Sequence, residues 1–76
     1  PDFRREWKKT QAEYELGRAL IAKRLAKRMS QRCLAKKAKT TQARISGIES
    51  MSSNPSLFLL KRIAEALGSK LKIQFA

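Results

Sequence analysis

The sequence has no histidine and only one cysteine, Cys33, so an intrachain disulfide is impossible and the common catalytic and metal-binding sets are missing. Without a second cysteine or a histidine as partner, Cys33 is expected to be a small, partly buried thiol. Paired acids that could line a cleft are missing as well. The sequence therefore predicts no enzyme, no metal site and no cofactor.

Long apolar runs are also missing. The start of the chain, with Asp2 and Glu6, lacks the apolar segment of a signal peptide. No stretch approaches the roughly 20 apolar residues that a membrane span needs. We therefore expect a cytoplasmic protein with no membrane partner.

Acidic residues are few. Eighteen Lys and Arg face six Asp and Glu, which gives a formal net charge of +12 on 76 residues. This excess points to a polyanionic partner, most simply a nucleic acid. RNA-binding modules usually present aromatic stacking platforms on a sheet or a glycine-rich clamp, and the sequence offers neither, which favours DNA over RNA. The length predicts a single domain with one modest core.

Glycine and proline are scarce, and the apolar spacing predicts one helix after another. Asp2 is a candidate cap for a short first helix. Thr10 and Glu13 have the spacing of a capping box, so a helix is expected over about 11–28, either separate from the first or continuous with it. Its predicted inner face is Leu16, Leu20, Ile21 and Leu25.

Three shorter helices are expected to follow: Ser30 and Thr41 are the N-cap candidates of the first two, and Ser56 opens the third. Their predicted spans are about 31–38, 42–50 and 56–67. Their predicted inner faces are Leu34, Ala35 and Ala38 in the first, Ile45 and Ile48 in the second, and Leu57, Leu60, Ile63, Ala64 and Leu67 in the third.

The end of the chain changes period, because Leu71, Ile73 and Phe75 alternate with polar residues as in a half-buried strand. A single strand leaves its backbone unpaired, so we expect it to pair with the same strand of a second copy. Phe58 and Leu59 lie off the predicted apolar face of their helix and are expected to join this dimer interface.

The second and third predicted helices are separated only by Lys39, Thr40 and Thr41. The second helix of such a unit can enter the DNA major groove and read base edges. Because Ile45 and Ile48 face inward, the candidate base contacts are Gln42, Ala43, Arg44, Ser46 and Gly47.

At these residues the sequence resembles the Xre/phage-repressor helix-turn-helix family. The resemblance rests on the Ser-Gln-x-x-Leu-Ala opening at 30–35, the Thr-Gln pair at 41–42, the Ile-Ser-x-Ile-Glu close at 45–49, and the segments 54–57 and 63–68. It implies an all-α, four- to five-helix domain like that of lambda repressor. The resemblance also implies that Gln42 reads a base, that Gln31 touches a phosphate, and that Arg24 and Glu49 form a structural ion pair.

Further phosphate contacts are expected from residues that flank the turn or lie near Gln31: Arg32, Lys36, Lys37, Lys39 and Thr41. The family usually has glycine where Lys39 stands. A lysine held at positive φ costs on the order of 1 kcal/mol, so the turn is expected to be mildly strained or differently shaped.

The segments 13–21 and 67–75 are similar to HigA-type antitoxins. That resemblance implies a homodimer that binds a double-stranded DNA operator, represses its own operon and neutralises a RelE/HigB-like mRNA endonuclease toxin. Phe3, Trp7 and Tyr14 are the candidate toxin contacts, although these aromatics could instead fold back onto the core. A stand-alone Xre-family repressor without a toxin is the alternative.

The expected organisation has three parts. Residues 1–15 form an N-terminal helical extension that is a possible toxin contact, residues 16–68 form the DNA-binding domain, and residues 69–76 form the dimerisation strand.

Overall fold

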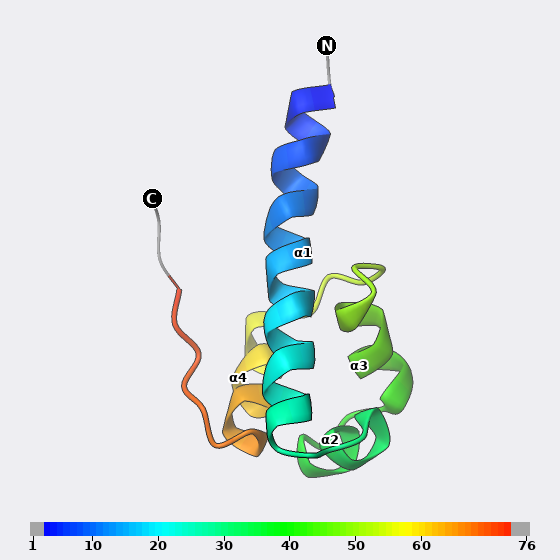
Figure 1. Ribbon diagram of the computed structural model, residues 1–76, viewed down its shortest axis with the longest axis vertical. Coiled ribbons are helices and arrows are strands. Elements are labelled where there is room, and N and C mark those ends of the chain that lie inside the picture. The colour runs from blue at the N-terminus through cyan, green and yellow to red at the C-terminus, as the bar shows by residue number, and fades with distance from the viewer. Residues whose placement is uncertain (1–2, 74–76) are drawn as a thin grey trace.

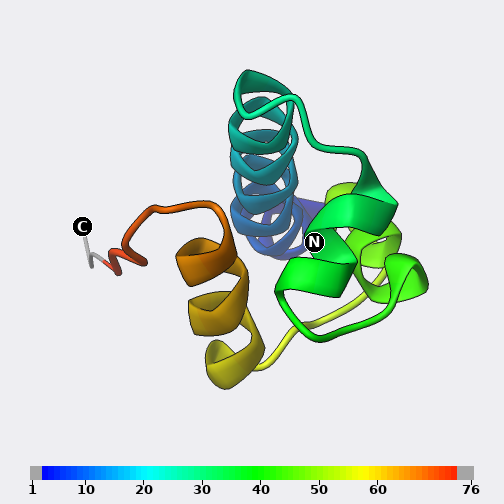
Figure 2. The ribbon, with the colours of Figure 1, turned by 90° about the horizontal axis from the view of Figure 1, so that it is seen from below.

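The computed structural model describes the backbone of residues 3–73 and the side chains of residues 11–73. Over that range the chain forms four helices and no strand: α1 (Phe3–Ala26), α2 (Gln31–Lys37), α3 (Gln42–Glu49) and α4 (Leu57–Ala66). The three shorter helices gather around the C-terminal half of α1, whose first turns stand clear of them (Figure 1). Viewed along α1, α4 lies on one side and the α2–α3 pair on the other (Figure 2). Among the described helices, none is long and apolar enough to cross a membrane.

The first helix is unbroken, so the two N-terminal segments are continuous. Thr10, the candidate start of a second helix, lies inside α1, and Asp2 lies outside the described residues. Nothing in this segment stops a helix, since it has no proline and is rich in Ala, Leu, Glu, Lys and Arg. With 24 residues, α1 is about 36 Å long, well beyond the reach of the shorter helices packed on it.

Each of the shorter helices starts at the N-cap that the sequence predicts. The side-chain oxygens of Ser30, Thr41 and Ser56 accept hydrogen bonds from the backbone N–H three residues further on, at 3.0, 3.2 and 3.0 Å. Each bond satisfies an amide that the first turn of a helix leaves without a partner. The predicted caps Ser30 and Thr41 are confirmed, and Ser56, the residue expected to open the last helix, is its N-cap.

All four helices also end alike. In each helix the residue directly after the C-cap has positive φ. The backbone N–H of the residue after that one donates to the carbonyl five residues earlier, at 2.8–3.0 Å. This is the Schellman arrangement, which satisfies the last carbonyls of a helix and favours glycine at the positive-φ position. Only Gly68 supplies that glycine, and the other three positions are Arg28, Lys39 and Met51.

The core lies where the C-terminal half of α1 meets the other three helices. Leu34, Ile45 and Ile48 are fully enclosed, as their predicted inward faces require. The other buried apolar residues are Leu20, Met29, Ala35, Ala38, Leu59, Ile63 and Leu67. All three predicted inner residues of α2 and both of α3 are therefore confirmed.

Two predicted inner faces need correction. Leu25 is 60% exposed, because the position four residues after buried Leu20 on the inward row of α1 is taken by Arg24. On α4 the inward row is Leu59, Ile63 and Leu67.

That shift on α4 changes the status of two leucines. Leu57 is 54% exposed and does not belong to the core, whereas Leu59 is 8% exposed and does. The structure thus places Leu59 in the core of the single chain and not on its surface, where the dimer interface was predicted.

After α4 the chain turns back and runs alongside α1 without forming a strand up to residue 73 (Figure 1). A strand needs a neighbour for its backbone N–H and C=O groups, and nothing among the described residues provides one. The predicted strand at Leu71 and Ile73 is thus not formed within the chain. Phe75 lies outside the described residues.

Candidate nucleic-acid interface

The α2–turn–α3 unit is held from inside by fully buried Leu34, Ile45 and Ile48. Ala35, 3% exposed, gives α3 room to pack closely on α2. The turn is tight because Lys39 has φ 58° and the Thr40 N–H donates to the Ala35 carbonyl at 2.9 Å. Lys39 thus adopts the left-handed conformation that glycine usually supplies, at a cost of about 1 kcal/mol.

A polar network fastens the far end of α3 to the first two helices. Arg24 Nε donates to Glu49 Oε2 at 2.7 Å and Nη2 donates to Oε1 at 3.2 Å. Arg24 Nη1 also donates to the Met29 carbonyl at 2.8 Å, and Gln31 Nε2 donates to Glu49 Oε1 at 2.9 Å. The side chains of the ion pair are 13% and 6% exposed, so this two-pronged pair is sheltered from water. It fixes how α3 sits against α1.

Gln31, the expected phosphate contact, belongs to this network. Its amide nitrogen carries two hydrogens, and one of them is directed to Glu49. The second hydrogen is available to an outside acceptor, and Glu49 holds the amide in place. The structure thus puts Gln31 at the start of α2 with its side chain already oriented.

Exposure divides the five candidate base contacts of α3 into two groups. Gln42, Ala43 and Arg44, in the first turn, are exposed. Ser46 and Gly47, further along, are half-buried, and Gly47 lies against the loop that follows α3. The most accessible part of α3 is therefore its N-terminal turn.

The remaining candidate phosphate contacts are all exposed: Arg32, Lys36, Lys37, Lys39 and Thr41. Across residues 31–56 the chain has five Lys and Arg but a single acid, Glu49, which is already paired with Arg24. A shallow depression whose lining includes Arg32, Lys36 and Gln42 joins α2 to the first turn of α3. The unit is therefore strongly basic, and Arg32 and Lys36 lie in the same depression as Gln42.

Three positions differ from expectation or escaped it. Cys33 is exposed rather than partly buried. Arg62 on α4 donates to the carbonyls of Ala38 and Lys39 at the end of α2, a contact between residues more than 20 apart that no local pattern could indicate. Gly17 on α1 lies directly against the backbone at the end of α3.

The three candidate toxin contacts lie on α1. The exposed Tyr14 ring is 5.6 Å from the guanidinium carbon of Arg18, whose Nη1 donates to the Tyr14 hydroxyl at 3.3 Å. Tyr14 thus does not fold back onto the core. The side chains of Phe3 and Trp7 lie outside the described residues.

One of three comparisons with known proteins gives a match. Searches of curated proteins and of solved structures found no match. The family model described as helix-turn-helix matches residues 20–73, more than two thirds of the chain, and that span contains α2, the turn and α3. The chain therefore belongs to the Xre-type helix-turn-helix family of DNA-binding domains.

Proposed function

We propose that this protein is a sequence-specific DNA-binding repressor that reads base edges with the first turn of α3. One observation carries the proposal. α3 buries Ile45 and Ile48 completely while Gln42, Ala43 and Arg44 stay exposed beside a basic α2. A recognition helix needs this division, because it must be fixed by its inner face and free at its N-terminal residues.

The chemistry of the exposed turn suggests what each side chain reads. The amide of Gln42 suits the N6 and N7 edge of adenine, and the guanidinium of Arg44 suits the O6 and N7 edge of guanine. The methyl group of Ala43 can contact a thymine methyl. Ser46 and Gly47 complete the proposed reading face.

Phosphate contacts are proposed from both ends of α2 and from the turn. Gln31 would contribute its oriented second N–H, and the exposed residues Arg32, Lys36, Lys37, Lys39 and Thr41 would add further contacts. Such contacts place the protein on the duplex without reading its sequence.

The test is selection of binding duplexes from a random pool by the full chain, followed by competition assays. With Gln42→Ala we expect loss of discrimination worth about 1–3 kcal/mol at one base pair. With Lys36→Gln we expect weaker binding to all sequences and a salt slope reduced by about 0.9. An unchanged sequence preference in Gln42→Ala would show that α3 is not the reading helix.

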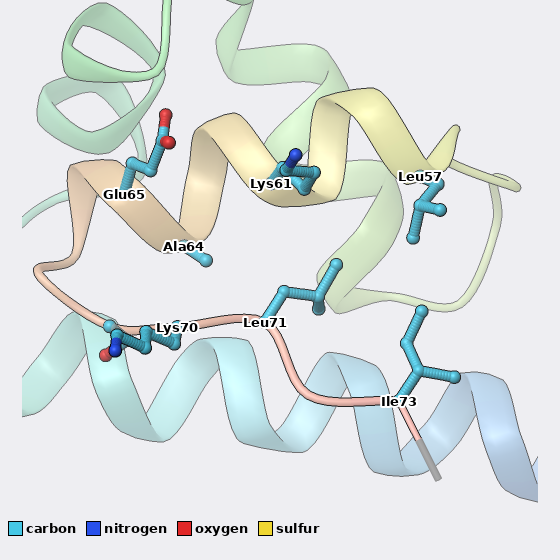
Figure 3. A pocket seen from close by; sticks show the side chains of 8 residues that line it. Leu57, Lys61, Ala64, Glu65, Lys70, Leu71 and Ile73 are labelled. Carbon is cyan, nitrogen blue, oxygen red and sulfur yellow. The ribbon is translucent and has the colours of Figure 1, made fainter. Parts of the chain in front are cut away.

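The dimer is a second element of the proposal. Leu57 and Ile73, which line one groove, are 54% and 59% exposed and leave a row of large apolar side chains beside α4; Phe58, the next residue of α4, is 70% exposed. Figure 3 shows Leu71 and Ile73 pointing from the C-terminal segment toward Leu57 across a groove. We propose that a second copy covers this row and pairs its own terminal segment with this one. A two-fold dimer would present two α3 helices to half-sites roughly 34 Å apart.

We further propose that the protein is an antitoxin of the HigA type. The resemblance of segments 13–21 and 67–75 supports this role, and so does the first half of α1, which stands clear of the other helices (Figure 1). Phe3, Trp7 and Tyr14 would contact a RelE/HigB-like toxin from that extension, since aromatic residues are favoured as binding hot spots.

Co-purification separates this role from that of a stand-alone repressor. An antitoxin is expected to retain a small basic toxin encoded beside it, and a truncation that starts at Gln11 is expected to lose that toxin while it keeps operator binding. A truncated chain that still neutralised the toxin would place the toxin contact elsewhere. A full chain that retained no neighbour-encoded protein would favour the stand-alone repressor.

A further inference from the structure

Arg62 on α4 is bonded to the turn from which α3 departs. Its Nε donates to the Ala38 carbonyl at 3.1 Å and its Nη2 donates to the Lys39 carbonyl at 2.7 Å. Ala38 is the last cap of α2, and Lys39 is the left-handed residue of the turn. The side chain of Arg62 therefore hydrogen-bonds two consecutive carbonyl groups in the turn between α2 and α3.

Two physical effects make these hydrogen bonds stabilising for the turn. The last carbonyls of a helix carry partial negative charge, and a cation placed on them is stabilising. The left-handed backbone of Lys39 is also unfavourable for a residue with a side chain, so it persists only when its surroundings fix it. A planar guanidinium holds its N–H groups in a fixed arrangement and can therefore orient two neighbouring carbonyls at once, whereas the donors of an ammonium group rotate freely and impose no such geometry.

Phe58 explains how Arg62 is held. Its ring lies 5.6 Å from the guanidinium carbon of Arg62, within the range of a cation–π contact. Phe58 is 70% exposed, so its ring adds little to the core of the single chain. Phe58 lies one turn before Arg62 on α4, so its ring packs against the guanidinium and limits the movement of that side chain.

We propose that Arg62 is a positioning residue for DNA recognition. It fixes the turn three residues before Gln42 and thereby sets the direction of α3, without touching DNA itself. This inference rests on the proposed DNA-reading role of α3. The geometry of the turn, however, can be tested without any DNA.

The chain contains a matched control for this proposal. Arg18 also lies over an aromatic ring four residues earlier, Tyr14, at the same 5.6 Å, but its recorded side-chain bond is to that tyrosine hydroxyl and not to a turn. Arg18→Met and Arg62→Met therefore remove the same charge and the same kind of ring contact. Only Arg62→Met releases the two carbonyls.

The first experiment is amide hydrogen exchange on the DNA-free protein. In Arg62→Met we expect the Thr40 amide, which closes the turn by donating to Ala35, to exchange at least tenfold faster relative to the Ile63 amide within α4. Arg18→Met is expected to leave that ratio unchanged. An equal rise at both amides would mean that Arg62 only stabilises the whole fold, and would overturn the proposal.

The second experiment measures binding to a duplex selected by the wild-type chain and to a scrambled duplex. Arg62→Met is expected to lose at least tenfold, about 1.4 kcal/mol, on the selected duplex and much less on the scrambled one, with an unchanged salt slope. A slope reduced by about 0.9 would show a direct phosphate contact and contradict the positioning role. If no duplex can be selected, the proposed function fails while the exchange result still decides the geometry of the turn.

A third variant tests the mechanism. Lys39→Gly removes the backbone strain at residue 39, which the hydrogen bonds of Arg62 offset in the wild type. We therefore expect Lys39→Gly to affect binding to the selected duplex more favourably in the Arg62→Met background than in the wild type. The loss of the lysine charge is common to both backgrounds and cancels in this cycle. Equal effects in the two backgrounds would show that Arg62 and the turn act independently.

Discussion

Gly17 of α1 lies so close to Glu49 that a Cβ atom added to the glycine would stand 2.9 Å from the Glu49 carbonyl oxygen. The Ile48 carbonyl oxygen would be 3.0 Å away. Both atoms belong to the backbone at the end of α3, so they cannot move aside as the tip of a side chain can. The absence of a side chain at Gly17 is what allows α1 and α3 to meet at this point.

We expect Gly17→Ala to lower the free energy of unfolding by about 1–3 kcal/mol, because the added methyl group forces the two helices apart. The expectation is contrary to helix propensity, which favours alanine over glycine by about 1 kcal/mol. Gly47→Ala is the control, since its Cβ would meet side-chain atoms and no backbone: the Ser53 hydroxyl at 3.0 Å and the Ser53 Cβ at 3.3 Å, in the exposed loop after α3. Urea denaturation of both variants tests this, and a more stable Gly17→Ala protein would contradict it.

The sheltered pair of Arg24 and Glu49 gives a second prediction. Glu49→Ala leaves the Arg24 guanidinium poorly compensated and removes the acceptor of Gln31, so we expect a loss of about 3 kcal/mol in unfolding free energy. The exposed Arg18→Met is expected to cost less than about 1 kcal/mol. Removing both partners with Arg24→Met and Glu49→Met is expected to cost less than the sum of the single changes. Additive losses would indicate that the pair is not coupled.

The helix ends supply a third prediction. Arg28 is exposed and has φ 55°, so Arg28→Gly relieves a left-handed conformation and is expected to raise stability by up to about 1 kcal/mol. Gly68→Ala makes the opposite change at φ 68° and is expected to lower it by a similar amount. Thermal unfolding of the two variants measures both effects. A destabilising Arg28→Gly would mean that the arginine side chain matters more than the backbone strain.

The proposed dimer gives a fourth prediction. Deletion of residues 71–76 removes Ile73 from the apolar row beside α4 but only one half-buried side chain, Leu71, from the described part of the chain. We therefore expect sedimentation to show a monomer with its helical content largely kept and operator binding much weaker. A deletion variant that stayed a tight dimer would move the interface to another surface of α1 or α4.

Local signals in the sequence predicted the start of the three shorter helices, because Ser30, Thr41 and Ser56 act within one turn of their own positions. The inner faces of α2 and α3 were also predictable, since both are short and have few apolar residues to choose from. On α4, which is apolar nearly all round at its start, spacing alone could not tell Leu57 from Leu59. Packing against the other helices decides between them.

The site shows the same limit. The exposed face of α3 follows from the inward Ile45 and Ile48. The lysine in place of glycine at the turn left two alternatives open, a mildly strained turn or a differently shaped one, and the structure has the strained turn, with Lys39 at positive φ. The grip of Arg62 on the Lys39 carbonyl could not be predicted, because it depends on how α4 crosses the end of α2. Which bases α3 reads stays a prediction.

The charge imbalance of residues 31–56 makes salt act in opposite directions on two equilibria. Five cations with one neutralised acid repel one another in the free protein, and added salt screens that repulsion, so the folded state gains stability as ionic strength rises. The same salt weakens DNA binding, since each counterion released from the duplex gains less entropy in a more concentrated salt solution. Bound DNA and dissolved salt therefore have the same electrostatic effect, since each reduces the repulsion among these basic residues. The operator is expected to raise the melting temperature most at the low ionic strength where the free protein is least stable.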